Sequence, residues 1–255
     1  MVRETEEGLQ AVIPAAGLGT RLRRVSGAGP KGLVDVAGRP LLSHVLDRVS
    51  AFDPRKIVVV IGPTGQEIPL VLGDHWGEVP LLYVRQSEPR GLAHALLVAA
   101  PVIAGDFVVM HGDVVFEPGA DLTPVLRRFR SRRADASVLV QSLGPEEVQR
   151  GACRVDSRGR VLDATEYPGP EERQWGHVLA GLYACTPMVL EACARIEPSE
   201  GGEHELSEAL GRLARQGRPV VATELEGDRV NVNTPGDLER AHHLLVRTLP
   251  ASDES

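Results

Sequence analysis

Short apolar runs alternate with segments of helical period through the first 140 residues of the chain. The predicted strands cover 10–14, 57–61, 81–84, 107–111 and 136–141. Between them, apolar side chains recur every three or four residues over 41–49, 92–99 and 122–129. This alternation favours parallel strands joined by helical crossovers. We therefore predict a doubly wound, Rossmann-like α/β fold with a mainly parallel sheet.

The chain after Gly144 has shorter apolar runs and more turn residues, such as those in "DSRG" and "YPGPEE". The predicted elements are strands at 152–155, 161–165 and 178–185, a helix at 206–216, a strand pair within 220–232 and a final helix. Thr234 and Asp237 are spaced to form a capping box at the start of that last helix. We expect a mixed β/α region here.

Length and composition describe an ordinary globular chain. Single cores stop growing at about 250 to 300 residues, so we predict one domain over 1–255, with one half at 1–143 and the other at 144–255. Hydrophobic residues make up 42% of the chain and charged residues 25%, which excludes disordered and fibrous classes. No apolar stretch approaches the roughly 20 residues of a membrane helix, and the start "MVRETEEG" does not resemble a signal peptide. A cytoplasmic protein without a membrane partner is expected.

Charge and cysteine spacing exclude further classes. The net charge of −7 argues against a nucleic-acid partner, although a local positive pocket for phosphates remains compatible with it. Cys153, Cys185 and Cys193 have neither CxxC nor Cys/His ligand spacing, which argues against a disulfide framework and a zinc site. We interpret them as small buried side chains.

A glycine-rich loop, "AAGLGTRL", follows the first predicted strand. Glycine permits a sharp turn and lets backbone N–H groups approach a bound oxyanion. The segment has Leu22 where the dinucleotide fingerprint needs a third glycine, and "GPKG" lacks the Ser or Thr of ATPase phosphate loops. We therefore predict a phosphate-binding loop of another kind, followed by the cations Arg21 and Lys31.

Lysine is rare in this sequence. Of 28 basic residues, only Lys31 and Lys56 are lysines. A lysine retained at 31 indicates a compact point charge aimed at one phosphate oxygen, for which a planar guanidinium is a poor substitute.

These motifs together resemble the sugar-nucleotide pyrophosphorylases, which join a nucleoside triphosphate to a sugar 1-phosphate and release pyrophosphate. The resemblance is carried by six ordered motifs: "AVIPAAGLGTRL" with "PKGLVDVAGRPLL", "VLGDHWGEVPLLYVRQSEPRGLAHALLVAA", "VVMHGDVVF", "ATEYP", "AGLYACTP" and "VNVNTPGDL". The second is similar to the base-reading segment of glucose-1-phosphate thymidylyltransferases and their uridylyltransferase relatives. The resemblance implies a nucleotidyltransferase fold whose first half binds nucleotide and whose second half binds sugar.

The resemblance implies a set of donor residues. The nucleotide-binding positions are Ala15, Ala16, Gly17, Leu18, Gly19, Thr20, Gln86 and Gly91. The loop amides and Arg21 would hold the β- and γ-phosphates, and Lys31 would neutralise the α-phosphate as the transition state forms. The amide of Gln86 can pair with the N3–H and a carbonyl of uracil or thymine, which favours UTP or dTTP.

Asp113 follows an apolar strand, so it lies at a carboxyl end, where open α/β sheets place their ligands. A hard oxygen there suits Mg²⁺, which takes one or two carboxylates together with phosphate oxygens. The resemblance adds Asn231 as second metal ligand, at a position that is aspartate in thymidylyltransferases and asparagine in several uridylyltransferases. We interpret His111 as structural.

On the acceptor side, the resemblance implies that Glu166 accepts hydrogen bonds from sugar hydroxyls while Gly151 and Gly181 present backbone to the sugar. The family has a lysine after this glutamate, which grips the sugar phosphate, and this chain has Tyr167 there. We hypothesise that Arg154, on the neighbouring strand, takes over part of the anion binding.

The leading hypothesis is a Mg²⁺-dependent transferase that joins UTP or dTTP to a sugar 1-phosphate or a sugar-like phosphate. Tyr167 leaves open cytidylyl or guanylyl transfer to a non-hexose phosphate. A third alternative is a non-catalytic module that senses nucleotide sugars. The two cations and the metal-competent residues argue against that module, and a homo-oligomer is compatible with each hypothesis.

Overall fold

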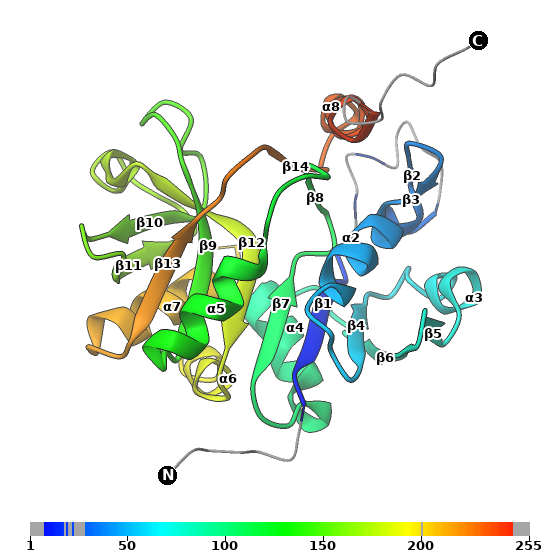
Figure 1. Cartoon of the computed structure of the whole chain (residues 1–255), viewed down its shortest axis with the longest axis horizontal. Helices are drawn as coiled ribbons and strands as arrows, with labels where there is room; N and C mark the ends of the chain where they lie inside the picture. Colours follow the sequence, from blue (N-terminus) through cyan, green and yellow to red (C-terminus); the bar gives the residue numbers. More distant parts are fainter. Residues whose placement is uncertain (1–7, 18, 20–21, 23–28, 200, 247–255) are drawn as a thin grey trace.

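A computed structural model of the chain describes residues 8–17, 19, 22, 29–199 and 201–246. Within these ranges the main sheet has ten strands, namely β1 (Gln10–Ala15), β4 (Ile57–Ile61), β5 (His75–Trp76), β6 (Val79–Arg85), β7 (Phe107–Met110), β9 (Ala136–Ser142), β10 (Ala152–Val155), β11 (Val161–Thr165), β12 (His177–Cys185) and β13 (Val220–Glu224). Their order is β11-β10-β12-β7-β1-β4-β6-β5, and β9 pairs with β12 and β13 (Figure 1). All five strands predicted in the first 141 residues are present, with ends shifted by up to two residues.

The sheet of the first half is mainly parallel, as predicted, and its central strands are buried. β1 pairs in parallel with β4 and β7, and β4 pairs in parallel with β6. β1, β4 and β7 consist almost entirely of buried residues, because helices cover both faces of a parallel sheet. The chain leaves β1 toward β4 on one side and returns to β7 on the other. The carboxyl ends of β1 and β7 therefore flank the point at which such folds bind ligands.

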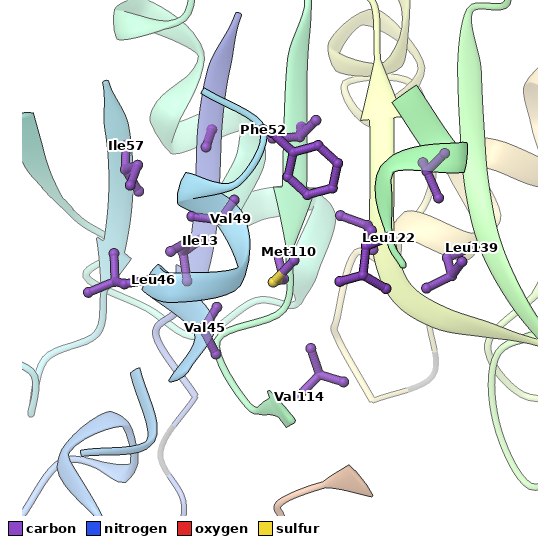
Figure 2. Packing of buried hydrophobic residues seen from close by; sticks show 14 of the residues in the cluster. Ile13, Val45, Leu46, Val49, Phe52, Ile57, Met110, Val114, Leu122 and Leu139 are labelled. Carbon is purple, nitrogen blue, oxygen red and sulfur yellow. The ribbon is translucent and has the colours of Figure 1, made fainter. Parts of the chain in front are cut away.

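Helices cover both faces of this sheet. The α-helices are α2 (Leu41–Ser50), α3 (Ile68–Leu72), α4 (Leu92–Ala99), α5 (Thr123–Arg132), α6 (Met188–Cys193), α7 (Leu206–Arg215) and α8 (Pro235–Val246); the 3₁₀ turns are η1 (Lys31–Leu33), η2 (Ala100–Val102) and η3 (Glu172–Trp175). The apolar stripes of α2 and α5 join one large core cluster, and those of α4, α6 and α7 join a second. Figure 2 shows the first cluster, in which Val45, Leu46 and Val49 of α2 lie beside Ile13 and Ile57 of the sheet.

The two halves of the chain share the sheet through β12, which runs antiparallel to both β7 and β9. The three cysteines are buried free thiols, as predicted. Among the helices of the described ranges, none has the length and apolarity needed to cross a membrane.

The predicted strand pair within 220–232 exists as two strands that do not pair with each other. β13 runs parallel to β9, whereas β14 (Arg229–Asn231) runs antiparallel to β8 (Val114–Phe116), which directly follows β7 and its turn. The remaining short strands, β2 (Asp35–Val36) and β3 (Arg39–Pro40), form a hairpin.

The pairing of β14 with β8 carries the end of β14 to the carboxyl end of β7. There the backbone N–H of Val232 donates to the carbonyl of Asp113 over 2.8 Å. The predicted capping box follows at once: the N–H of Thr234 donates to Asp237 Oδ2 at 2.8 Å, and the N–H of Asp237 donates to Thr234 Oγ1 at 3.2 Å.

Candidate active site

Two adjoining pockets, each of about 260 Å³, open at the carboxyl ends of the central strands. We name the first the glycine-loop pocket, and its lining includes Ala15, Ala16, Gly17, Lys31, Gln86 and Gly91. We name the second the β14 pocket, and its lining includes Gly151, Glu166, Ser207, Arg229, Asn231 and Asn233. Both pockets are lined by His111, Asp113, Arg150, Glu166 and Glu205. The site is thus a divided cleft with Asp113 at the junction.

Lys31 connects three distant parts of the chain at this junction. Its Nζ donates to Asp113 Oδ2 over 2.6 Å and to Asn233 Oδ1 over 2.8 Å. Burial opposes the ionisation of Asp113, but the charge of Lys31 and its hydrogen bond lower the pKa of that carboxyl below its ordinary value, so it is ionised. Gly19 lies beside the lysine with φ +57°, and a Cβ there would be 2.9 Å from Lys31 Cβ. The loop therefore needs glycine at this position to pack against Lys31.

Two hard oxygens lie together beside Lys31, and the amide oxygen of the pair comes from a different asparagine than the predicted metal ligand. The Lys31 ammonium lies between one carboxylate oxygen, from Asp113, and one amide oxygen, from Asn233, which are the hard ligands that Mg²⁺ takes in addition to phosphate oxygens. The predicted ligand Asn231 lines the β14 pocket, and its Oδ1 accepts a hydrogen bond from Arg229 Nη1 at 2.8 Å. The geometry therefore pairs Asp113 with Asn233, two residues further along the chain.

Gln86 lies at the far side of the glycine-loop pocket and is 2% exposed. Its Nε2 lies 3.3 Å from the carbonyl oxygen of Gly91 and 2.8 Å from Nδ1 of His94. Because the Gly91 carbonyl can only accept, the atom of the Gln86 amide that faces it is the nitrogen. The same nitrogen then donates its second hydrogen to His94 Nδ1, which acts as an acceptor. Both amide hydrogens are thereby used within the protein. Gln86 Oε1 has no partner in the described part of the chain.

Gly91 supports this arrangement through its backbone. It has φ +88°, and a Cβ there would lie 2.6 Å from the carbonyl oxygen of His204. The same stretch is held by hydrogen bonds from the N–H of His204 to the carbonyl of Arg90 and from the N–H of Ala93 to the carbonyl of His204. Only glycine fits where these two segments meet.

His111 sits between the two pockets with a buried Nε2 that has no partner in the described part of the chain. Burial lowers the pKa of His111 to about 4, so the ring is neutral at physiological pH. Its ring centroid is 5.5 Å from that of Tyr183, and its backbone N–H donates to the carbonyl of Gly181. Gly181, predicted to face the sugar, does not line either pocket; with φ +84°, it packs instead against the His111 ring.

Carboxylates gather where the pockets meet on the side of β11 and α7. Glu166 Oε2 accepts a hydrogen bond from Ser207 at 3.3 Å, and its backbone carbonyl accepts from Gly151 N–H at 3.1 Å. Burial raises the pKa of Glu166, an effect that Arg150 partly offsets. Burial, followed by the charge of Glu166 and a hydrogen bond to Glu203, raises the pKa of Glu205 to about 8. These groups can accept and donate hydrogen bonds to a polyhydroxylated ligand.

Tyr167 is 48% exposed and donates from its hydroxyl to Glu205 Oε1 over 3.2 Å. Its ring lies beneath the guanidinium of Arg150, 4.8 Å from the centroid. Arg154, predicted to replace the lysine missing at 167, is exposed on β10 and lines neither pocket. The arginines that line the β14 pocket are Arg150 and Arg229, neither of which sequence reasoning had singled out.

The predicted donor loop is described in part. Ala15, Ala16 and Gly17 line the glycine-loop pocket as expected. Leu18, Thr20 and Arg21 lie outside the described residues, so their predicted phosphate contacts stay predictions.

Comparison with known proteins agrees with this architecture. Residues 10–243 match the family model described as nucleotidyl transferase. The chain is 39% identical over 238 residues to the UTP–glucose-1-phosphate uridylyltransferase AglF of Haloferax volcanii, covering 93% of this chain and 96% of that protein. It is 31% identical to a glucose-1-phosphate thymidylyltransferase of Streptomyces antibioticus, covering 94% and 67% respectively.

Solved structures show the same fold at lower identity. A UDP-glucose pyrophosphorylase complexed with UDP-glucose superimposes with a TM-score of 0.82 at 21% identity, over 92% of this chain and 97% of that one. A Bacillus anthracis protein described as a putative glucose-1-phosphate thymidylyltransferase gives 0.82 at 24% identity, over 95% and 96%. On the family model and the 39% identical relative, this chain belongs to the nucleotidyl transferase family and is a nucleotidyltransferase.

Proposed function

We propose that the chain transfers a nucleotidyl group from UTP or dTTP to a sugar 1-phosphate, giving a nucleotide sugar and pyrophosphate. The observation that carries this proposal is the meeting of two pockets, one beside a glycine loop and one lined by carboxylates, at Asp113, which Lys31 contacts. The names of the relatives, a uridylyltransferase and a thymidylyltransferase acting on glucose 1-phosphate, support the same pairing of substrates.

The glycine-loop pocket is the proposed donor site. The loop backbone and Arg21 hold the β- and γ-phosphates, and Lys31 neutralises charge on the α-phosphate. Gln86 Oε1, the amide's free acceptor, receives a hydrogen bond from the N3–H of uracil or thymine. Cytosine has no hydrogen on N3, so this arrangement argues against the cytidylyl alternative.

The β14 pocket is the proposed acceptor site. Glu166 accepts hydrogen bonds from sugar hydroxyls, and the backbone of Gly151 borders the sugar. A phosphate oxygen of the acceptor attacks the α-phosphorus in line, and the bond from that phosphorus to the bridging oxygen of the β-phosphate breaks. No covalent enzyme intermediate is required, so the protein contributes positioning and charge neutralisation.

Asp113 and Asn233 are the residues that would hold Mg²⁺, since their oxygens already face a cation at 2.6 and 2.8 Å. The metal supplies neutralisation of phosphate charge when bound. With one carboxylate and one amide as ligands, we expect metal affinity to depend strongly on the bound triphosphate.

Pyrophosphate release tests the proposal. The protein with Mg²⁺ is mixed with UTP, dTTP, CTP or GTP and a panel of sugar 1-phosphates that includes glucose 1-phosphate. Turnover with UTP or dTTP is expected, and Lys31→Ala should reduce kcat by about 100-fold or more. Nucleotide-sugar binding without turnover across the panel would instead favour the sensing module.

A further inference from the structure

The acceptor half of the site lacks an assigned partner for a dianionic phosphate. Position 167 is tyrosine instead of lysine, and Arg154 lies outside both pockets. A sugar 1-phosphate must nevertheless be brought against a triphosphate of the same sign. Which residue binds this phosphate is a question that rests on the proposed function, and a residue of the β14 pocket has the required charge.

Arg229 stands at the wall of the β14 pocket, partly buried, on the strand that crosses the carboxyl end of β7. Its Nη1 donates to Asn231 Oδ1 at 2.8 Å and its Nη2 to the carbonyl of Leu179 at 3.4 Å. Its buried Nε has no partner in the described part of the chain. The described hydrogen-bond acceptors of this guanidinium are therefore neutral oxygens.

The charge of Arg229 is not balanced by an ion pair with a carboxylate in the described part of the chain. Burial lowers the pKa of Arg229, and the neighbouring Tyr183 and Asp113 partly offset the effect. Asp113 is itself engaged by Lys31 at 2.6 Å, and no carboxylate in the described ranges forms an ion pair with Arg229. Withdrawing a charge from water without a counter-charge is costly, so such a site indicates an anionic ligand.

Arg150, the other arginine of this pocket, is differently placed. It is 57% exposed, its Nη1 lies 3.6 Å from Glu166 Oε1, and its guanidinium stacks on Tyr167. Its charge is thus already opposed by a carboxylate on the sugar side of the pocket. Arg229 lines the same pocket without a carboxylate of its own, on the segment that also carries Asn233, the residue that contacts Lys31.

We infer that Arg229 binds the phosphate of the sugar 1-phosphate and that Asn231 positions it. The planar guanidinium offers paired N–H donors that match phosphate oxygens. Asn231 orients the group through a neutral amide oxygen and leaves its charge available. An aspartate at 231 would form an ion pair with Arg229 and neutralise that charge. Asn231 thereby serves the acceptor phosphate, whereas the metal ligand of this segment is Asn233.

Steady-state kinetics test the inference with Arg229→Gln, Arg229→Lys, Asn231→Asp and, as matched control, Arg154→Gln. UTP and the acceptor that the unmodified protein turns over best are varied in turn. Arg229→Gln should raise the acceptor KM by about tenfold or more while the UTP KM changes by less than about threefold, since a charged hydrogen bond acts on one substrate only. Arg229→Lys should recover part of the loss, because lysine restores the charge.

Asn231→Asp should raise the acceptor KM with the guanidinium intact, and Arg154→Gln should leave it unchanged. Thermal unfolding checks that each variant is folded; if Arg229→Gln does not fold, Arg229→Lys and Asn231→Asp carry the test. An unchanged acceptor KM in the folded Arg229 variants, or an equal rise in the UTP KM, overturns the inference alone. Absence of turnover by the unmodified protein across the panel overturns the proposed function and this inference with it.

Discussion

We predict that the amide of Gln86 selects which pyrimidine the proposed donor pocket accepts. Because its two hydrogens are used by Gly91 and His94, it presents only an acceptor to a ligand. Uracil donates N3–H to that acceptor, worth about 0.5 to 1.5 kcal/mol net. Cytosine places a lone pair there and leaves a buried acceptor unsatisfied, at a cost of about 1 to 3 kcal/mol. The summed preference of ~1.5 to 4.5 kcal/mol corresponds to about 10-fold to 2000-fold in kcat/KM.

The assay compares kcat/KM for UTP and CTP in the unmodified protein and in Gln86→Met, which keeps a similar volume but removes the amide. The UTP preference should fall toward unity in the variant. Gln149→Met is the matched control, because Gln149 is exposed and lines neither pocket. Equal kcat/KM values for the two nucleotides in the unmodified protein, or a preference that survives Gln86→Met, would refute the reasoning.

His94 is expected to keep this orientation at neutral pH. Its Nδ1 can accept from Gln86 only when the ring is uncharged. Burial, followed by the charges of Arg90 and His204, lowers the pKa of His94 below its ordinary value. The ring is therefore neutral near pH 7, and the amide remains locked with its oxygen free.

Other outcomes follow from the packing and the charges. Gly211→Ala should lower the free energy of unfolding by about 1 to 3 kcal/mol in urea titrations, because a Cβ would lie 2.4 Å from a β11 carbonyl oxygen. This loss outweighs the better helix propensity of alanine. In the control Gly236→Ala, the added Cβ meets nothing closer than 3.9 Å, so that variant should not be destabilised. Asn233→Ala should raise the Mg²⁺ concentration for half-maximal turnover roughly tenfold, and a larger effect of Asn231→Ala would contradict the assignment. Since the pKa of Glu205 is raised from 4.5 to about 8, the folded state keeps a proton that the unfolded chain loses, so stability should fall as pH rises across that interval. The slope is at most ~1.4 kcal/mol per pH unit, and thermal unfolding from pH 5 to 8 should find it reduced in Glu205→Gln.

Local patterns predicted the elements well where one residue type dominates. The run 57–61 consists of β-branched residues, and burial on both faces makes such a run both strand-forming and easy to locate. The capping box at Thr234 was equally local, since its two partners are three residues apart. The pairing of β14 with β8 depends on contacts more than 110 residues apart, as between Arg229 and Phe116, so the composition of either strand does not reveal it.

The position of Arg154 outside both pockets has a related reason. Arg154 belongs to the strand beside Glu166's segment, and sequence proximity suggested that its side chain reaches the sugar phosphate. Its exposure depends on which face of β10 it occupies, and a residue's face is fixed by pairing register. Arg229 was 62 residues from Tyr167, so nothing local linked it to the missing lysine.

One local pattern does indicate which residues of this segment face the pockets, namely the alternation in "RVNVN" from 229 to 233. Successive side chains of an extended segment point to opposite sides. Val230 and Val232 pack into the apolar cluster shared with β2, α2 and α8, so the polar residues that alternate with them face the pockets. This places Arg229, Asn231 and Asn233 on one side, in order along the cleft, with Asn233 nearest Lys31. Asn231, the predicted metal ligand, and Asn233, the proposed one, are two residues apart and therefore share this face. A single residue inserted within this segment should reverse the faces of the residues on one side of it, and so turn either Arg229, the proposed acceptor cation, or Asn233, the proposed metal ligand, away from the pockets.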